Sequence, residues 1–149
     1  MENTDLKLVI ALAKSYDLLF MNIANQVNSF GISLSEFGVL EMLYHKGKQP
    51  VQKIAERILV TSGTMTYVIN QLIKKQYVVR KKCLEDKRIV YVELSEMGLQ
   101  KIESVFPIHQ KYVESLFSSM RHETKVELIG GLKMLQETIH IHQGCVVND

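Results

Sequence analysis

The stretch from Ile54 to Val92 constrains the fold of this chain more than any other part of the sequence. Its pattern predicts two short helices, a strand, a charged hairpin and a second strand. The first helix is expected over Val51–Leu59 and the second over Thr61–Lys75, with a tight junction between them. Two short helices joined in this way indicate a helix-turn-helix, whose second helix enters the major groove of DNA.

The second helix has two chemically different faces. At helical spacing, one face is apolar and is predicted to be buried; it consists of Met65, Val68, Ile69, Leu72 and Ile73. The other face offers hydroxyls, an amide, a phenol and a lysine, which can contact base edges and phosphates. The DNA-contacting residues predicted for this helix are Thr61, Ser62, Gly63, Thr64, Thr66, Tyr67, Asn70 and Lys74.

The two segments that follow, Tyr77–Cys83 and Arg88–Leu94, are rich in β-branched and aromatic residues and predict a two-stranded hairpin, or wing. Residues 74–88 hold seven basic and two acidic residues, a balance of +5, whereas the whole chain is only +2. Positive charge directly after a helix-turn-helix favours DNA binding over an incidental solvated hairpin. The predicted DNA contacts of the wing are Arg80, Lys82, Asp86, Lys87 and Arg88.

This order of elements, with Asp86-Lys87-Arg88 in the wing and Ser95-Glu96-Met97-Gly98 after the second strand, resembles the MarR family of bacterial winged-helix transcription regulators. The resemblance extends over nearly the whole chain and implies a mainly α fold. It implies a single domain over residues 1–149, with a winged helix-turn-helix at 34–95 carrying a two-stranded β wing, flanked by dimerisation helices at 5–30 and 99–142.

The resemblance also implies roles for individual wing residues. The carboxylate of Asp86 pairs with a basic group and fixes the hairpin, and a basic residue at the tip, Lys87 being nearest, enters the minor groove. In the family, arginine is frequent at the positions of Gly63 and Tyr67. Its absence here removes guanine recognition by arginine from this helix, so an A·T-rich operator is expected. Gly63 would serve close packing or a close approach to DNA.

Long apolar helices are expected at both ends of the chain. Residues 5–30 carry apolar side chains over a surface wider than one core needs, which predicts a partner helix and hence a homodimer on a palindromic operator. The alternative is a monomer whose terminal helices pack only on themselves. Ser33 and Glu36 predict a capping box for a helix over 34–46, and Pro107 should kink or divide the helix after Gly98.

Two regulatory hypotheses follow. In the family, inducers bind between the dimerisation helices and the DNA-binding unit, where the aromatic candidates by position are Tyr16, Phe20, Phe37 and Tyr44; these residues are otherwise plain core. A small aromatic effector would suit them. The segments Tyr44–Pro50 and Ser62–Leu72, together with the wing that contains Cys83, are similar to the branch that senses quinones and related phenols. Cys83 lies beside Arg80 and two lysines, a setting that favours a reactive thiolate; the alternative is an unreactive strand cysteine.

Other classes of function lack their signatures. No signal peptide or charge-free run of transmembrane length is present, and the two cysteines, Cys83 and Cys145, form no CxxC motif. A reduced cytoplasmic protein with no membrane partner is therefore expected. His140 and His142 would point in different directions on a helix, so no metal site is predicted. No catalytic or cofactor motif is present, which argues against an enzyme and predicts no cofactor.

The sequence thus predicts a dimeric DNA-binding repressor that a small aromatic ligand or thiol modification releases from its operator. An activator would show the same features. A winged-helix protein-interaction module without direct operator binding is the alternative, and the charge of the wing disfavours it.

Overall fold

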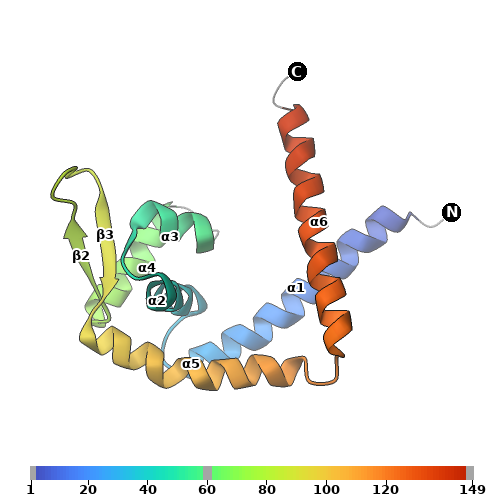
Figure 1. Cartoon of the computed structure of the whole chain (residues 1–149). Helices are drawn as coiled ribbons and strands as arrows, with labels where there is room; N and C mark the ends of the chain where they lie inside the picture. Colours follow the sequence, from blue (N-terminus) through green and yellow to red (C-terminus); the bar gives the residue numbers. More distant parts are fainter. Residues whose placement is uncertain (1–2, 59–61, 147–149) are drawn as a thin grey trace. The chain divides into compact units, whose positions relative to one another are not determined.

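The computed structural model describes the backbone of residues 3–58 and 62–146, and the side chains of residues 3–58 and 64–142 (Figure 1). The chain forms two compact units, residues 1–111 and residues 112–149. In chain order the elements are α1 (Thr4–Asn28), α2 (Leu34–Lys46), β1 (Gln49–Pro50), α3 (Val51–Ile58), α4 (Ser62–Lys74), β2 (Val78–Lys82), β3 (Val90–Leu94), α5 (Glu96–Leu116) and α6 (His122–Val146).

The predicted capping box at the start of α2 is confirmed. The backbone N–H of Glu36 donates to Ser33 Oγ over 3.1 Å, and the backbone N–H of Ser33 donates to Glu36 Oε2 over 2.8 Å. These reciprocal bonds satisfy two donors that a helix start leaves without intrahelical partners. Gly31, at φ 77°, turns the chain between α1 and α2.

The core lies between α2, α3, α4 and the sheet. Four of the five residues predicted for the buried face of α4 are 5% exposed or less, and Ile73 packs half-buried against them. Burial of these side chains removes apolar surface from water and so stabilises the helix-turn-helix. The core also takes residues from α1, α5 and the sheet; its fully buried members include Val27, Leu40, Ile54, Val78, Val92 and Ile102.

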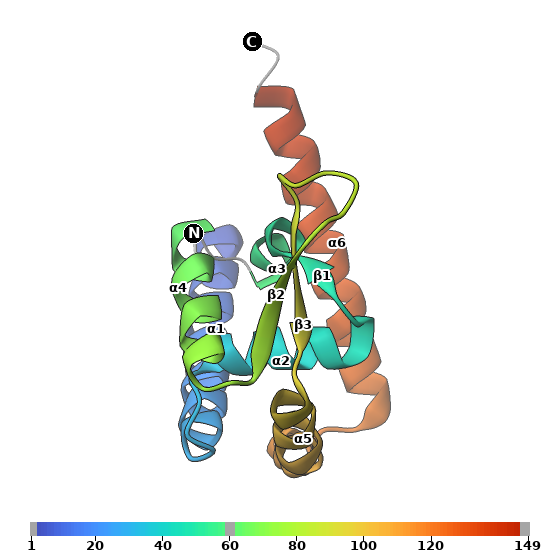
Figure 2. The same cartoon turned by 90° about the vertical axis from the view of Figure 1, so that its left-hand side faces the viewer.

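The sheet has one strand more than expected. The hairpin of β2 and β3 is confirmed, with antiparallel register from Val78 opposite Leu94 to Lys82 opposite Val90. The two residues of β1 then pair with β3, which gives the strand order β1-β3-β2 (Figure 2). No strand was predicted for these two residues, which directly precede the short helix predicted over Val51–Leu59. Pro50 fits an edge strand because it has no N–H to donate.

Pro107 does not divide the helix that contains it. α5 continues through this residue from Glu96 to Leu116. A proline inside a helix removes one backbone hydrogen bond, and Pro107 is exposed, so water can reach the freed carbonyl. In the second unit, α6 begins at His122 and ends at Val146. Among the helices of the described residues, none combines the length and the hydropathy needed to cross a membrane.

Candidate nucleic-acid interface

Helix α4 presents a polar face to solvent, directly opposite its buried face. Thr64, Thr66, Asn70 and Lys74 are exposed, and Tyr67 is 63% exposed. The buried residues between them fix the rotation of the helix, so these groups point outward together. Ser62 and Gly63 lie in the first turn of α4, and Thr61 lies outside the described residues.

The C-terminal end of α4 is held by a lysine that sequence reasoning did not single out. Lys75 Nζ lies 2.7 Å from Glu36 Oε2 and donates to the carbonyl oxygen of Gly31 over 3.2 Å. Glu36 is only 5% exposed, and a buried carboxylate requires such a partner. The ammonium therefore connects the end of α4 to the start of α2. The capping-box pattern predicts the bond between Glu36 and Ser33 but not the one to Lys75, because Lys75 lies 39 residues away in the sequence.

The base of the wing is fastened to the residues that follow α4. Ser95 Oγ donates to the carbonyl oxygen of Gln76 over 2.5 Å and accepts from the backbone N–H of Gly98 over 3.0 Å. The backbone N–H of Ser95 also donates to the carbonyl oxygen of Tyr77 over 3.0 Å. A Cβ added to Gly98 would lie 1.8 Å from that same Tyr77 oxygen. This contact explains why glycine stands there.

The tip of the wing carries its own ion pair. Arg88 Nη2 and Nε donate to the two carboxylate oxygens of Asp86 over 3.0 and 3.1 Å, and the Arg88 backbone N–H also donates to Asp86 Oδ1 over 3.0 Å. Hydrogen bonds from Arg88 lower the pKa of Asp86, and the same pairing raises the pKa of Arg88. The Arg88 side chain is nevertheless 91% exposed, and Lys87 beside it is also exposed.

The strands sort the remaining wing cations onto two faces. Side chains alternate along a strand, so Arg80 and Lys82 share the face of the buried Val78. Lys81 lies on the other face and forms an ion pair with Glu93 of β3. Arg80 and Lys82 are both exposed, which leaves them available to an external anion.

Cys83 directly follows β2 and is a half-buried free thiol. Its backbone N–H donates to the carbonyl oxygen of Ile89 over 2.9 Å, which closes the hairpin below the tip. The neighbouring Leu84 is 98% exposed. Cys83 therefore lies where the paired strands end and the exposed loop begins.

The four aromatic residues predicted for an effector site do not form one cluster of rings. Tyr16 and Phe20 contact each other on α1, with ring centroids 4.5 Å apart. On α2, Phe37 is 2% exposed and belongs to the core. Tyr44, expected to be buried, is 37% exposed, and its ring centroid lies 6.1 Å from that of Phe106 on α5.

His109 occupies the apolar seam between α5 and α1. Its Nδ1 lies 2.9 Å from Gln26 Oε1, and its ring lies 4.6 Å from the ring of Phe37. Burial lowers the pKa of His109, and the charge of Glu41 opposes this shift. No group of three or more potential metal ligands comes together in the part of the chain that the structure describes.

The family assignment rests on comparison with known proteins. The MarR family model matches residues 32–90. The HTH-type transcriptional regulator MhqR of Bacillus subtilis is 34% identical over 123 residues, which cover 83% of this chain and 85% of that protein. This chain belongs to the MarR family. Its relatives are HTH-type transcription regulators and not enzymes.

Solved structures agree with the assignment at the level of the fold. AbsC, a MarR family transcriptional regulator from Streptomyces coelicolor, superposes with a TM-score of 0.85 at 20% identity, over 94% of this chain and 97% of AbsC. Sco3205, a MarR family regulator from the same organism, was solved in complex with DNA. It superposes with a TM-score of 0.84 at 20% identity, over 93% of this MarR-family chain and 89% of Sco3205.

Proposed function

We propose that this chain acts, as a single functional domain, as a homodimeric repressor that binds a palindromic operator. Each copy would lay the exposed face of α4 in a major groove and its wing in the flanking minor groove. The two-fold axis of the dimer would place two such units about one helical turn of DNA apart.

One observation carries the proposal. The groups that can contact bases, among them Tyr67 and Asn70, lie together on the solvent face of α4, and the exposed cations of the wing follow directly in the chain. Base contacts supply sequence preference, whereas cations at phosphates supply affinity that falls with salt. A surface that joins both kinds of group suits an operator better than a protein partner.

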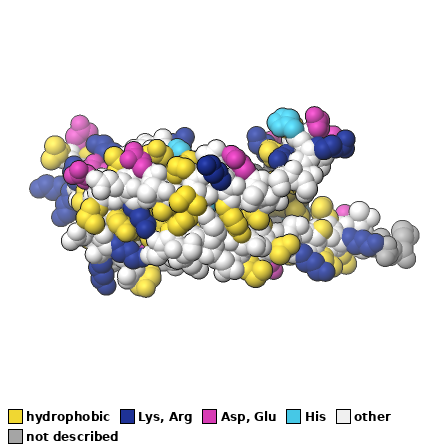
Figure 3. All heavy atoms as spheres, turned by 90° about the horizontal axis from the view of Figure 1, so that it is seen from below, with side chains coloured by type: hydrophobic (Ala, Val, Ile, Leu, Met, Phe, Trp, Pro, Cys, Tyr) yellow, Lys and Arg dark blue, Asp and Glu magenta, His cyan; other side chains and the backbone are white. Residues whose placement is uncertain are grey.

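The dimer is supported by apolar side chains on the terminal helices that the single chain leaves in solvent. Hydrophobic side chains, yellow in Figure 3, are visible at the molecular surface. Water contact over this much apolar area is unfavourable, so a second copy is the natural cover. The most exposed of these residues on α1 are Leu6, Val9, Tyr16 and Leu18, and on α6 they are Met134 and Ile141.

We further propose that a small aromatic or quinone-type compound releases the operator. A non-covalent ligand could stack on the paired rings of Tyr16 and Phe20 or on the partly exposed ring of Tyr44. Alternatively, alkylation or oxidation of the free thiol of Cys83 would disturb the hairpin directly below its tip. Either event weakens DNA binding to the extent that it favours a conformation the operator does not fit.

The decisive experiment titrates the protein, bound to the DNA upstream of its own gene, with 2-methylhydroquinone. Wild type and the Cys83→Ser variant are compared by fluorescence anisotropy at several salt concentrations. Release in wild type alone would establish the thiol switch, and release in both proteins would establish the non-covalent pocket.

Two other outcomes would contradict parts of the proposal. Tight binding without release in either protein would remove the quinone effector and leave the repressor. Absence of salt-dependent binding to this DNA and to mixed genomic fragments would remove the repressor and favour the protein-interaction module.

A further inference from the structure

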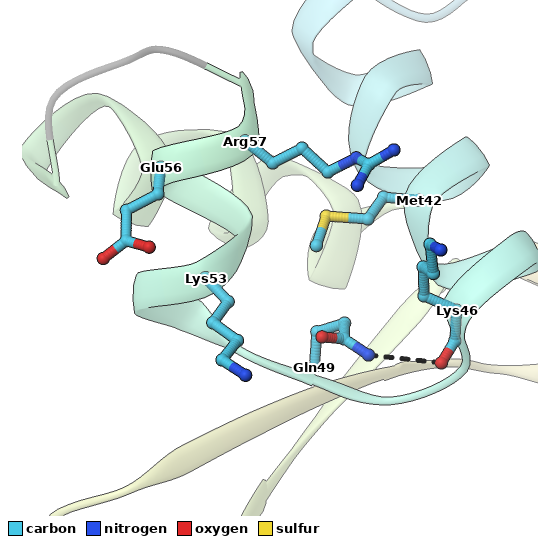
Figure 4. Close-up of a pocket in the computed structure, with 6 residues that line it drawn as sticks. All are labelled: Met42, Lys46, Gln49, Lys53, Glu56 and Arg57. Carbon is cyan, nitrogen blue, oxygen red and sulfur yellow. Dashed lines mark hydrogen bonds between the residues drawn. The ribbon is translucent and has the colours of Figure 1, made fainter. Parts of the chain in front are cut away.

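A second basic site lies where α2, β1 and α3 meet, apart from the surface proposed for DNA (Figure 4). It is an open hollow of about 450 Å³, a size typical of small-molecule sites. None of its lining residues belongs to α4 or to the wing. The lining residues are Met42 and Lys46 from α2, Gln49 from β1, and Lys53, Glu56 and Arg57 from α3.

The charge of this hollow is strongly positive. Its lining contributes three cations and one carboxylate, a formal balance of +2. Figure 4 shows Arg57 extending across Met42 toward Lys46, whereas the carboxylate of Glu56 points away from that guanidinium. Among the described side chains, no acidic group lies within ion-pair distance of these two cations or of Lys53. Cations without an internal partner attract an external anion.

The hollow also has an apolar wall. Met42 is only 9% exposed, and its thioether lies among the charged groups in Figure 4. The amide nitrogen of Gln49 donates to the carbonyl oxygen of Lys46 over 3.2 Å, which fixes one side of the opening. A polarisable thioether contacts apolar and aromatic groups well. The complement to this lining is therefore a molecule with a charged end and an apolar part.

We propose that this hollow binds a small organic dianion, namely a phosphomonoester attached to a compact apolar group. The planar fork of Arg57 can bind two oxygens of such an anion at once, and Lys46 and Lys53 add point charges. The apolar group would rest on Met42. A DNA phosphate is the competing occupant, but a backbone contact requires neither a concave site nor an apolar wall.

Such a ligand would contact α2 and α3 together. It would therefore fix the first helix of the helix-turn-helix against the helix that precedes it. The inference does not depend on the repressor proposal, because it concerns binding to the free protein by residues outside α4 and the wing.

The test uses the full chain with ¹³C-labelled methionine methyl groups and phenyl phosphate as the probe. The Met42 signal, assigned through Met42→Leu, should shift along a one-site saturation curve, while the other methionine signals shift little. Inorganic phosphate should bind more weakly because it lacks the apolar group, and phenol should bind more weakly because it lacks the charge. No shift of Met42 at millimolar phenyl phosphate would overturn the proposal.

Charge-removing variants complete the test. Arg57→Gln and Lys53→Gln should each weaken phenyl phosphate binding about tenfold or more, as expected for a hydrogen bond to a charged group. Lys111→Gln, an exposed lysine on α5, removes the same charge elsewhere and should leave binding unchanged. Equal loss in all three variants would indicate only general attraction and would overturn the site. Lower DNA affinity with a flatter salt slope in Arg57→Gln, without a methyl shift, would assign these cations to DNA instead.

Discussion

The two ends of the wing hairpin differ in how they are bonded and in how exposed they are. At the base, the hydroxyl of Ser95 is bonded twice, and Gly98 lies against the backbone of Tyr77. At the tip, the side chains of Asp86 and Arg88 bond to each other, and the Arg88 side chain is 91% exposed. The base determines where the hairpin points, and the tip carries charge at little cost to folding. Stability and DNA affinity should therefore respond to different residues.

The largest effect should come from the base. Gly98→Ala would place a methyl group 1.8 Å from the Tyr77 carbonyl oxygen, so the start of α5 must move away from the backbone that precedes β2. We expect the free energy of unfolding to fall by about 3 kcal/mol, measured by urea denaturation at fixed protein concentration.

A matched control for Gly98→Ala exists on α6. A Cβ added to Gly130 meets nothing within 4 Å, so Gly130→Ala should leave stability unchanged or raise it by up to about 1 kcal/mol. If both substitutions have the same effect, the contact at the base is not what requires glycine.

At the tip, Lys87→Ala with Arg88→Ala should weaken binding to every DNA sequence by about tenfold or more and lower the salt slope by about 2. Unfolding should be unaffected, because both side chains are exposed and exposed ion pairs contribute little. Fluorescence anisotropy over a salt series measures the slope. An unchanged slope, or a clear loss of stability, would contradict the division between base and tip.

The exposed face of α4 should respond differently from both ends of the wing, because substitutions there should change sequence preference and not general affinity. Asn70→Ala should reduce discrimination between operator and mutated operator by about 1–3 kcal/mol, and Tyr67→Phe should have a smaller effect in the same direction. Competition binding against a panel of single-base changes measures this discrimination. Equal loss of affinity for all sequences would mean that these side chains contact phosphates.

The smallest effect concerns the far part of α5. Because burial lowers the pKa of His109 below 6.5, the unfolded chain binds a proton more readily than the folded chain. The stability that depends on neutral His109 should be complete above pH 6.5. It should be lost as the pH falls from 6.5 through the lowered pKa of the folded state. His109→Gln should remove this part of the decline in urea titrations, whereas His122→Gln, on exposed α6, should not. Identical pH profiles for wild type and His109→Gln would contradict the assignment.

Much of this architecture follows from periodicity in the sequence. The spacing of Met65, Ile69 and Leu72 predicted both the helix and the face that is buried, because a helix needs one apolar stripe to pack. Likewise, β-branched residues predicted the hairpin, and Ser33 with Glu36 predicted a helix start. These signals are local, so the sequence contains them in full.

Contacts between distant segments could not be predicted in this way. The strand β1 has two residues, too few for an alternating pattern, and it exists only because β3 is beside it. The ion pair of Lys75 and Glu36 and the contact of Gly98 with Tyr77 depend on how elements meet. The resemblance to MarR regulators identified the motif Ser95-x-x-Gly98. The structure shows why these residues are needed there: Ser95 bonds to the neighbouring backbone, and only glycine fits against Tyr77.

The fastening at the base of the hairpin has a consequence for evolution. Since Ser95 and Gly98 hold the strands from below, changes of charge or side-chain shape at the exposed tip residues Lys87 and Arg88 should disturb the fold less than changes at the base. New DNA contacts should therefore arise more easily by substitution at the tip than by substitution at the base.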